Sequence, residues 1–321
     1  MGIRNKFFYI ITTIILWAAM GLFSFSFYSY TKSRVDGNHH LIGASYMTMN
    51  NEFYKIIHEE ISQRVEAEGD QIILRDPALS VERQIRQINE MLDMGIDVLV
   101  LAPVDWKSLT DVLGRAKEMG VYIVVVDTNV RDSNLVDCTI TSNNYLAGRL
   151  VGNYFTSRHS EAKVVLMIQE GAKSGRDRTR GFTEAIHKLP GIEIVDEIEC
   201  EGQLEIAMPR MQKILEEGKE FDTVFCLNDL AAVGVVAALD ERDLLDQIEV
   251  YGVDASPDSK ALIKEGMMMA TAAQFPSKIG IGAADNIYNL LNGELVPDNI
   301  YTPVELVSID NVDSYGIERW Q

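Results

Sequence analysis

Polar side chains follow several apolar runs of this sequence, close to the points where those runs end. In an open parallel sheet, ligands bind beyond the carboxyl ends of the strands, so these side chains are expected to converge. Carboxylates, amides and guanidinium groups pair with adjacent hydroxyls of a sugar, and aromatic rings pack against its C–H face. These residue types therefore predict the binding of a small polyhydroxylated molecule. The candidate ligand-binding residues are Asn51, Phe53, Tyr54, Asp127, Thr128, Arg178, Asn228, Asp254 and Gln274.

Helix capping is the alternative explanation for each of these polar residues taken singly. Asn and Asp often stand between a strand and a helix, where the side chain accepts a backbone hydrogen bond. For Asp229 we favour the cap. The convergence of several such positions with an arginine favours binding for the set as a whole.

Motifs for catalysis and for metal or nucleotide binding are incomplete in this chain. The segment GAKSG at 171–175 is superficially similar to a phosphate loop, but that loop needs a Gly-Lys pair with a glycine five residues before it, and here Ala172 precedes Lys173. His58 begins a pattern similar to a zinc-protease helix, but Ser62 stands where the second histidine should be. No G-x-G-x-x-G or G-x-S-x-G motif follows a predicted strand. We therefore predict no catalytic residue, no metal and no cofactor.

Composition restricts the class of partner. The net charge of −19 comes from 48 acidic and 29 basic residues. No basic face is available to neutralise phosphates, so nucleic acid is not an expected partner. The cysteines Cys138, Cys200 and Cys226 are too widely spaced to suggest a zinc site or a redox pair. For Cys226, which lies in an apolar run, a buried thiol is expected.

The first forty residues predict a membrane attachment. Residues 7–30 are almost uninterruptedly apolar and aromatic and follow Arg4 and Lys6. A helix of this length can cross a bilayer, so we predict a signal anchor at 7–30, a cytoplasmic end at 1–6 and a stalk at 31–40. A cleaved signal peptide is the alternative. The rest of the chain is then extracytoplasmic at the cell membrane, and no nearby cysteine offers a site for lipid attachment.

The body from residue 41 onward has an α/β pattern. Short β-branched runs alternate with amphipathic stretches, as in parallel sheets covered by helices on both faces. The number of units is about twice what one doubly wound sheet carries, so two similar lobes are expected. The predicted strands are 41–46, 71–74, 97–101, 121–126, 163–168, 192–198, 223–227 and 249–253.

From residue 41 to residue 310 the chain resembles the ribose-binding, type I family of periplasmic binding proteins. The motifs that carry the resemblance are MNNEFY at 49–54, GRDRTRGF at 175–182, CLNDLAAVG at 226–234, YGVDASPD at 251–258 and ATAAQFPSKIG at 270–280. This resemblance implies two doubly wound parallel-sheet lobes joined by a three-strand hinge. It places 41–142 and 275–303 in the N-terminal lobe, and 143–274 and 304–321 in the C-terminal lobe.

The resemblance also implies roles for the candidate residues. Asn51, Asp127, Arg178, Asn228, Asp254 and Gln274 should hydrogen-bond a sugar, with Phe53 and Tyr54 packing on it. Two departures from the family pattern concern the ligand. Thr128 stands where ribose-binding members carry arginine, and 201–204 lacks a second aromatic residue. Ribose is therefore not the expected ligand, whereas another sugar, a larger polyol or an inositol fits the change.

Two functions fit this pattern, and two others are disfavoured by it. The first is an extracytoplasmic binding subunit that delivers a sugar or polyol to the membrane permease of an ATP-driven ABC importer. The second is a membrane-anchored sensor that reports occupancy to a kinase or chemoreceptor. An enzyme is disfavoured because binding already explains the only candidate bases, Asp127 and Asp254. A transcription regulator is disfavoured because an apolar span occupies the place of a DNA-binding helix pair.

Overall fold

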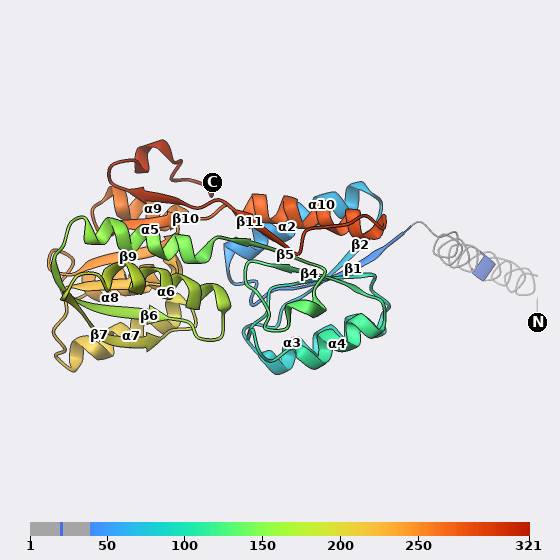
Figure 1. The fold of residues 1–321 in the computed structure, drawn as a ribbon, viewed down its shortest axis with the longest axis horizontal. Coiled ribbons are helices and arrows are strands. Elements are labelled where there is room, and N and C mark those ends of the chain that lie inside the picture. Colours follow the sequence, from blue (N-terminus) through green and yellow to red (C-terminus); the bar gives the residue numbers. More distant parts are fainter. Residues whose placement is uncertain (1–19, 22–38) are drawn as a thin grey trace, which may run out of the picture.

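The computed structural model describes residues 20–21 and 39–321 and contains two α/β lobes that lie side by side (Figure 1). The predicted membrane span at 7–30 lies outside the described residues, except for Met20 and Gly21. Within the described ranges, no helix has the length and apolar character needed to cross a bilayer.

The first lobe is built on a six-stranded sheet with the order β11-β5-β4-β3-β1-β2, and all of its pairs are parallel. Helices α2 and α10 cover one face and share a core with alternate residues of the strands, such as Ile42 and Val100. Helices α3 and α4 cover the other face, where Leu99 and Leu101 are buried. The bounds are β1 (Leu41–Ser45), α2 (Glu52–Ala67), β2 (Gln71–Arg75), α3 (Val81–Asp93), β3 (Val98–Leu101), α4 (Thr110–Glu118), β4 (Tyr122–Val126), β5 (Cys138–Ser142), α10 (Pro276–Leu291) and β11 (Asn299–Thr302).

The second lobe has the same plan, with strand order β12-β10-β9-β8-β6-β7. Helices α5 and α6 pack on one face of this sheet, and α7 and α8 pack on the other. Strand β12 pairs with β10 in the antiparallel direction, so this sheet is not wholly parallel. The bounds are α5 (Asn144–Thr156), β6 (Glu161–Ile168), α6 (Lys173–Ile186), β7 (Gly191–Glu199), α7 (Leu204–Glu216), β8 (Thr223–Cys226), α8 (Asp229–Asp240), β9 (Glu249–Asp254), α9 (Pro257–Lys264), β10 (Ala270–Ala273) and β12 (Glu305–Ser308).

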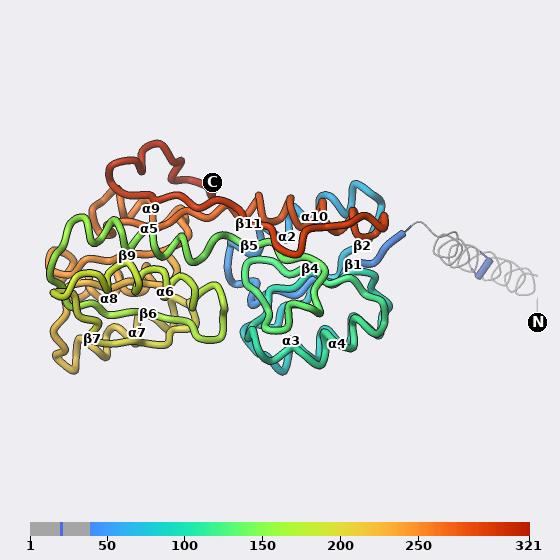
Figure 2. The backbone as a smooth tube through the Cα atoms, viewed as in Figure 1, coloured from blue at the N-terminus to red at the C-terminus, as the bar shows by residue number. Residues whose placement is uncertain are grey.

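The chain passes between the two sheets three times among the described residues. It leaves the first sheet after β5, returns to the first lobe between β10 and α10, and leaves it again between β11 and β12. These passages lie together between the lobes (Figure 2). The last residues then return to this junction, where the C-terminal end of the chain lies (Figure 1).

The two-lobed α/β architecture predicted from the sequence is confirmed, with some elements missed. All eight predicted strands are present within one or two residues of their predicted bounds. Strands β5, β10, β11 and β12 were not among them, and their short sequences contain few large apolar residues. The thiols of Cys138, Cys200 and Cys226 are buried and free, which confirms the expectation for Cys226.

Candidate functional site

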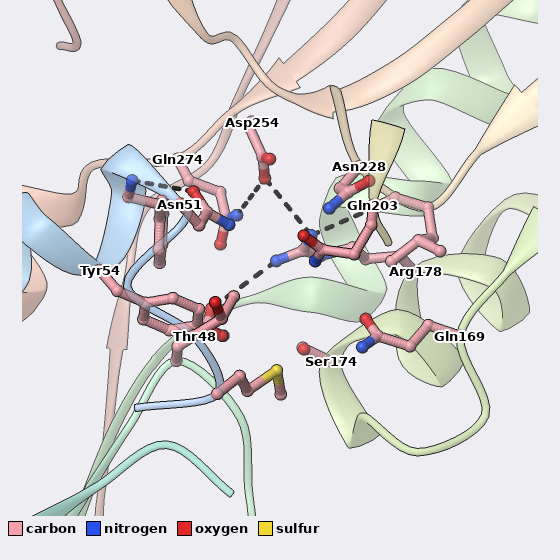
Figure 3. Close-up of a pocket in the computed structure, with 14 residues that line it drawn as sticks. Thr48, Asn51, Tyr54, Gln169, Ser174, Arg178, Gln203, Asn228, Asp254 and Gln274 are labelled. Carbon is pink, nitrogen blue, oxygen red and sulfur yellow. Dashed lines mark hydrogen bonds and ion pairs between the residues drawn. The ribbon is translucent and has the colours of Figure 1, made fainter. Parts of the chain in front are cut away.

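A small polar pocket lies between the lobes, and side chains from both lobes line it (Figure 3). Its volume of about 30 Å³ is enough for only one or two water molecules. A sugar therefore requires the walls or the lobes to move apart. The first lobe contributes Met47, Thr48, Asn51, Phe53, Tyr54 and Asp127, the second contributes Gln169, Ser174, Arg178, Gln203, Leu227, Asn228 and Asp254, and Gln274 follows β10 at a passage between the lobes.

Among the residues that the structure describes, Arg178 on helix α6 is the only cationic side chain that lines the pocket. Its Nε donates to Asn144 Oδ1 at 2.8 Å, and its Nη1 donates to Asp254 Oδ1 at 3.3 Å. Its Nη2 lies 3.8 Å from Asp127 Oδ1 in the first lobe. The guanidinium thus faces carboxylates from both lobes and is only 4% exposed. Figure 3 shows its contact with Asp254.

The depth of Arg178 depends on close packing between helices α5 and α6. A Cβ atom added to Gly148 on α5 would lie 1.8 Å from the backbone oxygen of Arg178. A Cβ on Gly181 of α6 would lie 2.1 Å from the backbone oxygen of Tyr145. Only glycine fits at these two positions, because any side chain would push the helices apart and move the arginine.

Asp127 and Asp254 present their carboxylates from opposite lobes. Tyr54 donates its hydroxyl to Asp127 Oδ2 at 2.8 Å, and Gln274 donates Nε2 to Asp254 Oδ1 at 2.6 Å. Burial raises the pKa of both carboxyls, that of Asp254 to about 8, while the Arg178 guanidinium opposes the rise. Two buried carboxylates and one guanidinium therefore leave an excess of acceptor oxygens in the pocket.

Both aspartates also have an unusual backbone conformation. The φ angle is 66° at Asp127 and 137° at Asp254, which non-glycine residues rarely adopt. Such conformations cost roughly 1–3 kcal/mol each and cluster at functional sites. The chain thus tolerates strain at the two positions where carboxylates enter the pocket.

Gln274 has an unused acceptor in the pocket. Its Oε1 is buried without a hydrogen-bond partner, one of a few such side-chain atoms in the described part of the chain. Buried polar groups in native proteins are nearly always paired, so an orphan in a ligand cavity indicates a missing partner. A ligand hydroxyl would supply the donor that Gln274 lacks.

Asn51 and Asn228 combine helix capping with a place in the pocket wall. Asn51 Oδ1 accepts from the backbone N–H of Phe53, and Asn228 Oδ1 accepts from that of Ala231. The cap of α8 is therefore Asn228 and not Asp229. The carboxylate of Asp229 instead accepts hydrogen bonds from Ser256, Ser259 and Thr271, which join α8 to the β9 and β10 region.

Thr128 differs from the other predicted ligand-binding residues because it does not line the pocket. Its side chain is fully buried and its Oγ1 accepts from the backbone N–H of Ser174 at 2.9 Å. It thereby joins the first lobe to the start of α6. The remaining eight predicted residues all line the pocket.

Other residues that line the pocket were missed in the sequence. Gln169 directly follows β6 and Thr48 lies shortly after β1, so the rule of strand ends could have found both. Gln203, which precedes α7, and Ser174, which lies within α6, carry no comparable signal. Asn144 was also missed, although it contacts Arg178 and the backbone oxygen of Asp127 and so lies between both lobes.

The described chain matches a known family and known structures. The family described as periplasmic binding protein domain matches residues 42–295. The ribose import binding protein RbsB of Bacillus subtilis is 24% identical over 269 residues, covering 83% of this chain and 86% of that protein.

Two solved structures illustrate the similarity of fold. An ABC transporter solute binding protein from Mycobacterium smegmatis with bound glycerol has a TM-score of 0.80 and 28% identity, covering 86% of this chain and 96% of that one. Another, from Bacillus halodurans with bound myo-inositol, has a TM-score of 0.80 and 24% identity, with the same coverage.

Proposed function

This chain belongs to the periplasmic binding protein domain family, and we propose that it captures a small sugar or polyol between its two lobes for an ATP-driven importer. The relatives support this assignment, since they include a ribose import binding protein and solute binding proteins of ABC transporters with bound glycerol and myo-inositol. We propose a binding role and no catalytic step.

The observation that carries the proposal is the set of polar groups at the pocket. Asp127 and Asp254 offer acceptors from opposite lobes, Arg178 offers donors between them, and Gln274 Oε1 lacks a partner. Adjacent sugar hydroxyls act as donors and acceptors at once, so they complement such a set. We therefore propose that ligand contacts to both lobes favour the form with the lobes together, which is what a membrane partner recognises.

The test is a melting experiment, followed by intrinsic fluorescence, on the full chain with pentoses, hexoses and inositols. A ligand present at 100 times its Kd stabilises the folded form by about 2.7 kcal/mol. For a lobe of this size, that raises Tm by several degrees. A shift with one sugar or polyol supports the proposal, and a flat panel on folded, ligand-free protein contradicts it.

A sensor role is the second candidate, and the apolar segment 7–30 favours it modestly. That segment would hold the binding lobes permanently at the membrane beside a partner such as a kinase or chemoreceptor. Crosslinking of the full chain in cells separates the two roles. Sugar-dependent capture of a permease supports import, whereas capture of a kinase or chemoreceptor supports sensing.

We propose an extracytoplasmic location for the lobes, in keeping with the family. We further propose that residues 7–30 anchor them in the cell membrane as a single uncleaved span. Retention of the full-length chain in washed membranes would support the anchor. Release of a shorter chain that lacks the first thirty residues would instead indicate a cleaved signal peptide.

A further inference from the structure

A second cavity adjoins the polar pocket and differs from it in chemistry. It has a volume of about 200 Å³ and a largely apolar surface, to which Leu204, Leu230, Val233, Pro257 and Trp320 contribute. The other lining residues are polar and include the acidic side chains Glu52, Asp229, Asp254 and Asp258. Asn51 and Asp254 line both this cavity and the polar pocket, so the two spaces share a wall. A ligand held by Asp254 would therefore have the second cavity as its neighbour.

Trp320 is held at this cavity by a set of long-range contacts. Its ring packs edge-on against Phe53 of the first lobe, with centroids 5.6 Å apart. The next residue, Gln321, donates Nε2 to the backbone oxygens of Asp254 and Gln274 at 2.9 and 2.7 Å. The fully buried Lys260 donates Nζ to Gln321 Oε1 at 3.1 Å and thus fixes the same amide. Contacts with both lobes therefore hold the indole in place at the cavity.

The polar groups around the cavity already have partners or remain in solvent. Asp229 accepts hydrogen bonds from Ser256, Ser259 and Thr271. The helix N-termini that meet here carry acidic residues such as Glu52 and Asp258 in their first turns, which match their positive ends. The charged residues at the cavity are all acidic, so it does not suit an anion, and its largely apolar surface suits an uncharged apolar occupant.

We propose that the ligand is a glycoside with an apolar aglycone, whose sugar ring occupies the polar pocket and whose aglycone occupies the cavity against Trp320. The inference rests on the proposed sugar-binding function. Size supports it, because an apolar cavity of about 150 Å³ accommodates benzene, and this one is larger. Trp320 would supply the second aromatic that the sequence lacks at 201–204. Burial of an aromatic ring against these walls strengthens binding by roughly ten- to a hundredfold.

The test compares free sugars with their phenyl glycosides by calorimetry on the full chain. The probes are D-glucose, D-galactose and D-xylose and their phenyl β-glycosides. We expect at least one phenyl glycoside to bind about tenfold more tightly than its free sugar. Binding of free sugars without any such preference would overturn the inference and leave the proposed function intact. Absence of binding by every probe would overturn the inference and contradict the function for these sugars.

Two variants locate the aglycone. Trp320→Ala removes one wall of the cavity, and Val233→Phe fills its space. Each variant should bring the ratio of glycoside affinity to free-sugar affinity close to one. Trp106→Ala is the matched control, because Trp106 lies outside both cavities, and it should keep the wild-type ratio. A wild-type ratio in both cavity variants would overturn the inference. If Trp320→Ala fails to fold, Val233→Phe alone decides.

Discussion

Replacement of Asp254 tests the assignment of the pocket and its electrostatics together. The carboxylate is only 6% exposed and accepts from Gln274 at 2.6 Å and from Arg178 at 3.3 Å. In Asp254→Ala a bound sugar loses the acceptor for one or two hydroxyls, each worth about 1–3 kcal/mol when its partner is buried. Affinity for a sugar is therefore expected to fall by roughly a hundredfold, measured by calorimetry.

Ionisation of the buried Asp254 carboxyl should also make the stability of the ligand-free protein depend on pH. Burial raises the pKa of Asp254 to about 8, above its usual value of 3.8. The folded state thus binds a proton between about pH 4 and pH 8 that the unfolded state releases. The stabilisation that this proton provides is fully present below about pH 4. The free energy of unfolding then falls by about 1.4 kcal/mol per pH unit as the pH rises from about 4 to about 8, where the stabilisation is lost.

Urea unfolding of the ligand-free protein at pH 5 and pH 7 measures this effect. The wild type should lose roughly 2–3 kcal/mol over this interval relative to Asp254→Asn, which keeps the side-chain volume but cannot ionise. Equal pH dependence of the two proteins would refute the electrostatic reasoning. Unchanged sugar affinity in Asp254→Ala would refute the site assignment, provided that the variant is folded.

Three further substitutions test how the pocket is built. Gly148→Ala should lower the free energy of unfolding by about 1–3 kcal/mol and weaken sugar binding, because the added methyl group displaces Arg178. Gly114→Ala is the control, since Gly114 has open space around it, and it should change neither stability in urea unfolding nor affinity in calorimetry. Thr128→Val should lower the free energy of unfolding by about 1–3 kcal/mol without changing affinity, and a large loss of affinity would restore Thr128 to the binding site. Tyr54→Phe should lower affinity about tenfold by removing the donor to its partner carboxylate, and unchanged affinity in calorimetry would exclude that role.

The sequence predicted the parts of the fold that depend on local patterns. Strands such as Val98–Leu101 are apolar at every position because helices cover both faces, so they are visible in the sequence. Strand β10, with the sequence ATAA, has no such pattern and forms a strand because β9 and β12 pair with it on either side. That pairing is non-local and leaves no local signal.

The candidate site also contains residues that a local sequence pattern predicts and residues that only the folded chain brings together. Asp127 and Gln274 directly follow strands and Asp254 is the last residue of one, so the rule of strand ends predicts all three, and each lines the pocket. Thr128 also follows a strand, but its side chain turns toward the start of α6, a direction that sequence does not encode. Trp320 lies far along the chain from Phe53, and only the return of the C-terminal segment brings the two rings together.

The charges in the pocket explain why a ligand would change the relation between the lobes. When the lobes meet, Asp127 and Asp254 are buried together with a single guanidinium, and the distance of 3.8 Å from Arg178 to Asp127 exceeds that of a hydrogen bond. Burial raises the pKa of both carboxyls, so ionising them carries a penalty when no ligand pairs with them. Sugar hydroxyls that donate to both carboxylates would remove the penalty only while the lobes are together. The free energy of closure would then come from the ligand, and a partner that recognises the closed form would respond to occupancy.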